Sequence, residues 1–144
     1  MSIWFMNSET APGRVHSWIP ASGHGLRHAG IHFDAVRIMG VLAEQVAYEL
    51  MQFTDFQAGP IIREATSCQY MYFLVPPQSA TGFRWPAGVR ALGRGARGWA
   101  YVGVPALGGL TWPLAWRSEP TAEVPFVEAG LLHEVVSRLI GVVR

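Results

Sequence analysis

The chain has 144 residues, half of them hydrophobic, and a formal net charge of +1 at pH 7. This length suits one core, so we expect a single domain over residues 1–144. The opening MSIWFMNSET lacks the basic start and long apolar run of a secretory signal, and no stretch approaches the roughly 20 apolar residues that span a bilayer. The single cysteine, Cys68, excludes an internal disulfide. These features predict a cytoplasmic protein without a membrane partner.

Charge is distributed unevenly along the chain. Residues 1–58 carry three arginines against five acidic residues, residues 59–118 carry six arginines against Glu64 alone, and residues 119–144 carry two arginines against four glutamates. No lysine is present, which we attribute first to GC-rich coding and second to recognition of phosphate or carboxylate groups by guanidinium. A basic middle between acidic ends indicates either an anionic partner or an ordinary solvated face.

The first half of the chain predicts one strand and one helix. Residues 1–30 mix Gly, Pro, Ser and His without a sustained period, which predicts irregular chain with a short strand around Arg14 to Ile19. The run IHFDAVRI, residues 31–38, is rich in β-branched and aromatic residues and predicts a strand. From Val41 to Phe53 the apolar residues fall every three or four positions, which predicts an amphipathic helix of about three turns.

Short strands are predicted in the middle of the chain. We expect a hairpin of residues 61–64 and 69–75, in which the apolar arm QYMYFLV lies mid-sheet with both faces covered. Further strands are predicted at residues 89–92, 99–104 and 111–116.

A second helix is predicted near the C-terminus, where apolar residues recur at helical spacing from Leu132 to Val143. We expect Pro125 in its first turn. The order strand, helix, several strands, helix predicts an α+β domain, with a mostly antiparallel sheet of about five or six strands and two main helices.

Three of the five histidines lie in GHGLRHAGIHFD, residues 23–34. On a helix, His24, His28 and His32 would share one face, which a zinc site could use, but three glycines interrupt the segment and disfavour a helix. If His32 begins a strand, it shares a face with Asp34, and the pair could bind a divalent metal or move a proton once His24 or His28 folds back over them. The other interpretation is that these are ordinary polar residues of a loop and a strand rim.

The basic stretch Phe83–Trp99 interleaves four arginines with two tryptophans and contains no acidic residue. Arginine binds phosphate and an exposed aromatic ring stacks on a base, which are the contacts that single-stranded nucleic acid needs. Tryptophan is more often a core residue, so we expect at least two of the four tryptophans in residues 85–116 to be buried. The candidates for contact with nucleic acid are Arg84, Trp85, Arg90, Arg94, Arg97 and Arg117.

Several characteristic strings lie in order along residues 31–116: HFDAVRI, GPIIRE, MYFLVPP, WPAGVRALGRGARGWAYVGVP and TWPLAW. With the helix after the first string, they resemble the short bifunctional DNA primase/polymerase-like proteins of GC-rich bacteria. In those proteins an FDxV strand and a helix are followed by a GPV segment, an LYFLVPPG strand, a PGVRxLG turn, a VxVPP strand and a tryptophan-containing strand. The resemblance rests on apolar strands and proline turns, so it bears on fold more than on activity.

The resemblance also implies which residues a catalytic site would need. Active members of the wider primase/polymerase family hold two divalent metals and a nucleotide triphosphate with an acidic pair spaced by one residue, a downstream histidine and a further carboxylate. Asp34 matches the first acid, but Val36 stands at the second, and no histidine lies between His32 and His133. Since His32 would not restore a magnesium site, the resemblance implies that polymerase chemistry is lost, with Asp34 and His32 as the residual catalytic candidates.

Three functions stay open on these grounds. The first is a non-catalytic primase/polymerase-like domain that binds nucleic acid or a nucleotide through the arginines and Trp85. The second is a protein-interaction module that docks a partner, or a second copy, through its C-terminal helix or exposed tryptophans. The third is a small metal-dependent enzyme built on His24, His28, His32 and Asp34. The resemblance and the charge distribution favour the first.

Overall fold

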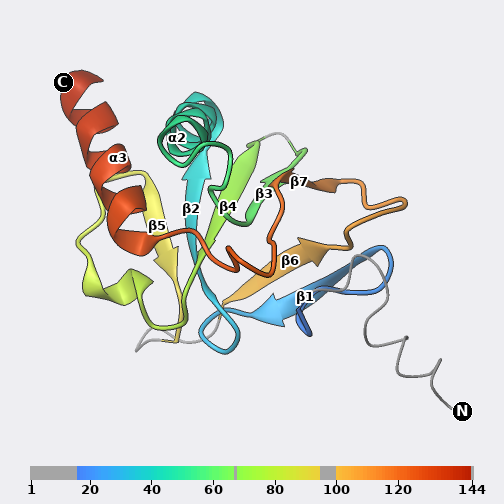
Figure 1. Ribbon diagram of the computed structural model, residues 1–144. Helices are drawn as coiled ribbons and strands as arrows, with labels where there is room; N and C mark the ends of the chain where they lie inside the picture. Colours follow the sequence, from blue (N-terminus) through green and yellow to red (C-terminus); the bar gives the residue numbers. More distant parts are fainter. Residues whose placement is uncertain (1–15, 67, 95–99, 144) are drawn as a thin grey trace, which may run out of the picture.

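The computed structural model describes residues 16–66, 68–94 and 100–143, and Figure 1 shows its arrangement. In this part of the chain seven strands and two α-helices form an α+β fold, as predicted. The strands are β1 (His24–His28), β2 (Asp34–Met39), β3 (Ile61–Glu64), β4 (Tyr70–Val75), β5 (Val89–Leu92), β6 (Tyr101–Pro105) and β7 (Leu114–Ser118). The helices are α2 (Gly40–Phe53), α3 (Ala129–Val143) and a short 3₁₀ helix, η1 (Ala80–Gly82).

Five strands form the main sheet, in the order β5, β2, β4, β3, β7, and every neighbouring pair is antiparallel. β1 and β6 form a separate antiparallel pair. β4 lies at the centre of the main sheet, so Tyr72 stands opposite Arg37 of β2 on one side and opposite Ile62 of β3 on the other. Neighbouring strands lie about 4.8 Å apart, which brings opposite side chains on one face into contact range.

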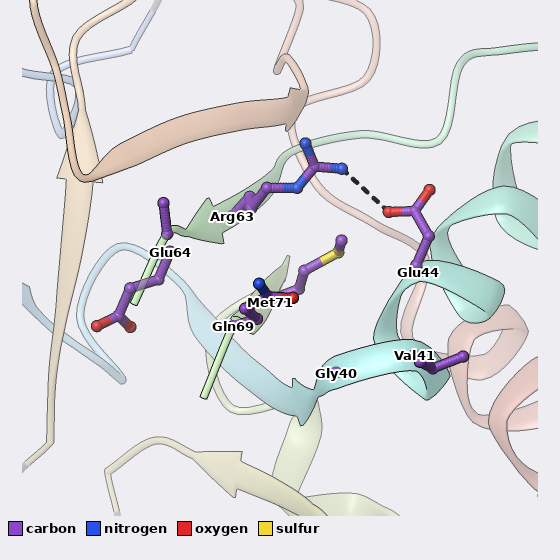
Figure 2. Close-up of a pocket in the computed structure, with 8 residues that line it drawn as sticks. Gly40, Val41, Glu44, Arg63, Glu64, Gln69 and Met71 are labelled. Atoms are coloured by element: carbon purple, nitrogen blue, oxygen red, sulfur yellow. Dashed lines mark hydrogen bonds and ion pairs between the residues drawn. The ribbon is translucent and has the colours of Figure 1, made fainter. Parts of the chain in front are cut away.

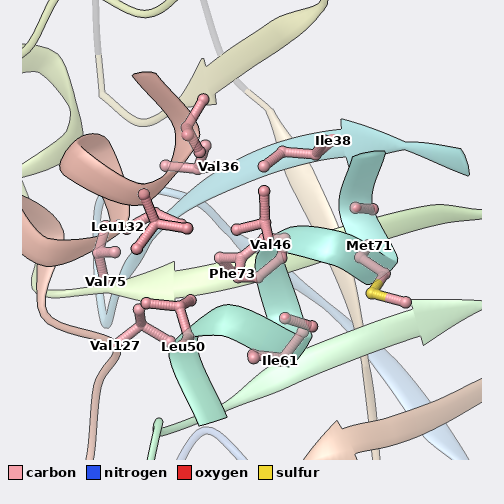
Figure 3. Close-up of a cluster of buried hydrophobic side chains, with 14 of the residues drawn as sticks. Val36, Ile38, Val46, Leu50, Ile61, Met71, Phe73, Val75, Val127 and Leu132 are labelled. Atoms are coloured by element: carbon pink, nitrogen blue, oxygen red, sulfur yellow. The ribbon is translucent and has the colours of Figure 1, made fainter. Parts of the chain in front are cut away.

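The two helices cover one face of the main sheet. Alternate residues of β2, β3 and β4 point to this face and pack against α2 and α3, as Figure 3 shows. The fully buried side chains of this first core include Val36, Ile38, Val46, Leu50, Ile61, Phe73, Val75 and Leu132. Because α2 follows β2 directly and lies back over it, the predicted strand and helix pack on each other.

The β1–β6 sheet covers part of the opposite face and lies at the lower right of Figure 1, away from α2 and α3. Val102 and Val104 of β6 pack there with residues of the main sheet such as Ile62 and Leu74, and form a second core. A Cβ atom on Gly103 would lie 2.8 Å from Cδ1 of Leu114. Glycine at this position therefore allows β6 to lie close against β7.

Two predictions on the N-terminal segment are wrong. Residues 24–28 form β1 within the segment expected to be irregular, because their backbone pairs with β6 although HGLRH lacks a strand pattern. Residues 16–19 form a turn rather than a strand, with the Ile19 N–H donating to the His16 carbonyl oxygen at 3.1 Å. Arg14 lies outside the described residues.

The first strand of the main sheet begins later than predicted, at Asp34 instead of Ile31. Gly30 has a φ of +99°, and its N–H donates to the Phe33 carbonyl oxygen at 2.6 Å, so residues 30–33 form a tight turn. His32 lies exposed in this turn and not on the strand.

Two later predictions also change. α3 begins at Ala129, after Pro125, because the Glu128 carboxylate accepts a hydrogen bond from the Leu131 N–H at 2.6 Å and starts the helix. β4 is covered on both faces only along its C-terminal half, since Tyr70 and Tyr72 are half-buried.

No helix in the described part of the chain has the length and apolar character that a bilayer crossing requires.

Candidate nucleic-acid interface

Within the residues that the structure describes, one end of the main sheet has no covering layer on the face opposite the helices. Side chains there alternate along their strands with residues of the first core, which places them on the other face. We call this surface the open face, and its residues are Arg37, Met39, Glu64, Tyr70, Tyr72 and Arg90. Each of these side chains is half-buried or exposed.

Direct contacts link the aromatic and charged side chains of the open face. The guanidinium carbon of Arg37 lies 4.3 Å from the centre of the Tyr70 ring. The ring centres of Tyr70 and Tyr72 are 6.4 Å apart, and the Tyr72 hydroxyl donates to Oε1 of Glu64 at 3.0 Å. The four side chains therefore form a continuous group across β2, β4 and β3.

Tyr72 acts as a hydrogen-bond donor within this group. Burial of its ring, together with the neighbouring Glu64 carboxylate, raises the pKa of Tyr72 to about 12. The phenol therefore stays protonated well above neutral pH, and its hydroxyl hydrogen fixes the orientation of the Glu64 carboxylate.

Arg37 and Arg90 stand directly opposite each other on β2 and β5. Among the described residues, neither forms an ion pair with a carboxylate. Like charges at opposite positions of neighbouring strands repel each other. Bound phosphate groups would offset this positive charge, so the two arginines are suited to an anionic ligand.

The arginines of the helix face share one carboxylate within the protein. Glu44 of α2 accepts hydrogen bonds from Arg63 at 3.0 Å and from Arg117 at 2.7 Å. The bond from Arg117 is the largest cause that holds the pKa of Glu44 below its usual value, and Glu44 in turn raises the pKa of Arg117. Arg117 is therefore part of an internal ion pair and does not join the open face.

A hollow of ≈ 420 Å³ lies beside this ion pair, between the start of α2 and the strands β3 and β4. Figure 2 shows Arg63 and Glu44 pointing toward one another across it, while Glu64 points away from them. Glu44 and Arg63, the charged pair that lines the hollow together with Glu64, already bind each other.

Trp85 is half-buried and packs beside the first core. Its Nε1–H donates to the Ala80 carbonyl oxygen at 2.8 Å, and its ring meets the rings of Phe83 and His133. Trp85 therefore lies on the helix side of the main sheet and does not belong to the open face.

Those of the predicted arginines that the structure describes lie on different elements. Arg84 is exposed in the loop before β5, and Arg94 is exposed beyond the end of β5. Arg97 lies outside the described residues. Of the described residues predicted to contact nucleic acid, Arg90 is the one that belongs to the open face.

The predicted metal site of His24, His28, His32 and Asp34 does not assemble. His24 and His28 lie at the two ends of β1, and the His28 ring packs edge-on against Tyr101, with ring centres 4.3 Å apart. Within the ranges that the structure describes, no group of three His, Cys, Asp or Glu side chains could hold a metal ion. The spacing HxxxHxxxH brings three imidazoles together only on a helix, and this segment is a strand and a turn.

Asp34 is fully buried at the start of β2. Its Oδ2 accepts a hydrogen bond from the Ala80 N–H at 3.1 Å, and a Cβ atom on Gly93 would lie 2.9 Å from the carboxylate carbon. Its Oδ1 has no hydrogen-bond partner among the described residues. The carboxylate thus links the starts of β2 and η1 beneath the end of β5, and it is enclosed by protein instead of facing a substrate.

The sequence-based predictions did not include Arg37, Glu64, Tyr70 and Tyr72 among the contact residues. A usable signal was present, because polar or aromatic residues alternate with fully apolar ones in VRI and in YMYF.

Comparison of the chain with protein-family models, with curated proteins and with solved structures gives no match in any of the three. The resemblance to primase/polymerase-like proteins therefore stays a prediction, and the open face carries the argument for function.

Proposed function

We propose that this domain binds single-stranded nucleic acid on its open face without catalysing a reaction. The observation that carries the proposal is the pair Arg37 and Arg90, two guanidinium groups on opposite positions of neighbouring strands with no carboxylate partner in the described residues. A chain of phosphates supplies the negative charge that such a pair lacks. A cytoplasmic location is part of the proposal.

Stacking surfaces beside the arginines support a single-stranded ligand in particular. Tyr70 and Tyr72 lie next to Arg37, and both rings are half-buried, so part of each ring meets solvent. Aromatic rings and guanidinium planes stack on bases that are free of a partner strand. In a duplex the bases are already stacked, so duplex would use the arginines and not the rings.

Two residues support the absence of catalysis. Asp34 is enclosed by protein, and Val36, which stands where active primase/polymerase family members carry their second acid, packs in the first core. A pair of acids at these positions would point into the helix-covered layer and not toward the open face. The open face offers Glu64 as its one carboxylate, which is too few oxygen ligands for a two-metal site.

Fluorescence anisotropy with labelled single-stranded and duplex oligonucleotides over a salt series tests the proposal. We expect saturable binding of the single strand that weakens with salt, and a double variant Arg37→Ala/Arg90→Ala that reduces the slope of log K against log[salt] by about 1.4, which is two lost phosphate contacts. Circular dichroism and thermal unfolding establish that the variant is folded.

The matched control is Arg63→Ala/Arg138→Ala. It removes the same charge from arginines that already pair with Glu44 and Glu49 away from the open face. We expect this control to bind nearly as the unmodified protein does. Equal losses in both double variants would show unspecific attraction to a basic protein, and absence of binding at low salt would overturn the proposal.

A protein-interaction module is the second candidate, because large apolar side chains are exposed in one loop. Trp112 is 78% exposed and Leu110 is 94% exposed, in the loop between β6 and β7. The Leu114 N–H donates to the Thr111 carbonyl oxygen at 3.0 Å, which holds Trp112 in a defined turn. Sedimentation of the protein over a concentration series, with Trp112→Ser for comparison, tests whether this loop joins copies of the chain.

A further inference from the structure

Glu64 is the one acidic residue of the open face, and it is also the one acidic residue in positions 59–118. A carboxylate beside phosphate-binding arginines repels the ligand unless it meets a hydrogen-bond donor on that ligand. Resting on the function proposed above, we infer that Glu64 selects a guanine base in the bound single strand.

The Glu64 carboxylate is held in place before any ligand arrives. Its Oε1 accepts the hydrogen bond from the Tyr72 hydroxyl at 3.0 Å. An ionised carboxylate has about four acceptor positions, of which Tyr72 occupies one. Oε2 and the second lone pair of Oε1 can therefore accept from a ligand without breaking this contact.

The position of Glu64 relative to the stacking surface suits the edge of a base. Arg63 of β3 pairs with Met71 of β4, so Glu64 and Tyr70 are the next opposite residues. Cβ atoms of opposite residues on one face are about 5 Å apart. A base stacked on Tyr70, or on the Arg37 guanidinium above it, presents its edge to the neighbouring strand within reach of the carboxylate.

Guanine matches a carboxylate better than the other bases do. Its Watson–Crick edge carries two adjacent N–H donors, at N1 and N2, which a carboxylate accepts through both oxygens. Adenine and cytosine each offer one amino group next to an acceptor nitrogen, and thymine or uracil places its N–H between two carbonyl oxygens. The acceptors repel the carboxylate, so we expect the affinity order guanine first, cytosine and adenine next, thymine or uracil last.

The test compares short oligothymidine strands that carry one central guanine, inosine, cytosine, adenine or thymine. A bidentate contact discriminates by roughly fivefold or more, so the guanine strand should bind at least about fivefold tighter than oligothymidine. Inosine lacks the N2 amino group and should lie between the two. Glu64→Gln should abolish the guanine preference, while its affinity for oligothymidine stays equal or rises, because the repulsion of phosphate is gone.

Two further variants separate recognition from unspecific effects. Glu49→Gln removes a carboxylate that pairs with Arg138 away from the open face, and it should keep the guanine preference. Tyr72→Phe keeps the ring but removes the hydroxyl that orients Glu64, so the preference should fall without loss of oligothymidine binding.

The outcomes distinguish this inference from the function on which it rests. If all strands bind equally and Glu64→Gln changes nothing, the guanine selectivity is overturned while single-strand binding stands. If no strand binds, both are overturned. A preference that survives Glu64→Gln would place base recognition on another residue and also overturns the inference.

Discussion

The two faces of the main sheet use arginine in opposite ways. On the helix face, Arg63 and Arg117 share the Glu44 carboxylate and so hold α2 against β3 and β7. On the open face, Arg37 and Arg90 stand opposite each other without an acidic partner among the described residues. The same side chain is thus a structural contact on one face and an available cation on the other.

This difference arises from alternation along single strands. Neighbouring residues of a strand point to opposite faces, so Tyr72 lies on the open face while Phe73 lies in the first core. A count of arginines or aromatic residues along the sequence does not separate those on the open face from those on the helix face. The face on which a residue lies decides whether it stabilises the fold or can meet a ligand.

Replacing Phe73 by alanine should give the largest effect on stability. Phe73 is fully buried in the first core, and truncation of a buried phenylalanine costs about 3–5 kcal/mol. Tyr72→Ala removes the adjacent ring on the open face, where it is half-buried, and should cost clearly less. Urea unfolding of both variants measures the difference. Equal losses would mean that the open face is packed as firmly as the core, which would contradict the comparison.

Glu44→Gln should lower the free energy of unfolding by less than Phe73→Ala does, but by more than Glu64→Gln does. The loss of Glu44 leaves Arg117, whose side chain is 21% exposed, without its carboxylate partner. Because Glu44 itself is 45% exposed and screened by solvent, we expect a loss of about 1 kcal/mol. Among the described residues Glu64 forms no ion pair, so Glu64→Gln should change stability by less than about 0.5 kcal/mol.

The pH dependence of stability provides a second measurement on the ion pair of Glu44 and Arg117. The pKa of Glu44 is lowered in the folded protein from its ordinary value of 4.5, first by Arg117. Such a group stabilises the fold above its unfolded pKa, and this contribution is lost as pH falls from 4.5 through the folded pKa. The difference between unmodified protein and Glu44→Gln should therefore shrink on acidification. A difference that stays constant with pH would show that packing, and not charge, sets the effect.

Much of the fold was predictable from the sequence because several segments carry their own pattern. The apolar spacing from Val41 to Phe53 corresponds to α2, and residues 89–92 form β5 as predicted. β1 was missed because HGLRH has no alternation of its own and forms a strand through pairing with β6. The residue pattern of a segment shows which of its side chains will be buried. It does not show that the backbone of the segment will pair with a distant strand, as HGLRH pairs with β6.

The candidate site was harder to predict for the same reason. Arg37 and Arg90 are more than fifty positions apart in the sequence and become opposite residues only when β5 adds beside β2. Sequence proximity instead favoured the stretch Phe83–Trp99, where Trp85 packs inward and Arg90 joins the open face. Which arginines act together depends on the strand order, and residue spacing along the chain does not determine that order.

The smallest expected effect on stability is a gain instead of a loss. Arg90→Ala removes one of two opposed guanidinium groups, so the free energy of unfolding should rise by a few tenths of a kcal/mol. Arg138→Ala removes an exposed arginine that pairs with Glu49 at 3.2 Å, so the free energy of unfolding should fall by a similar amount. Thermal unfolding at low salt measures both changes, and both should shrink as salt screens the charges. A loss of stability in Arg90→Ala would mean that Arg90 has a stabilising partner, and the open face would then resemble the helix face.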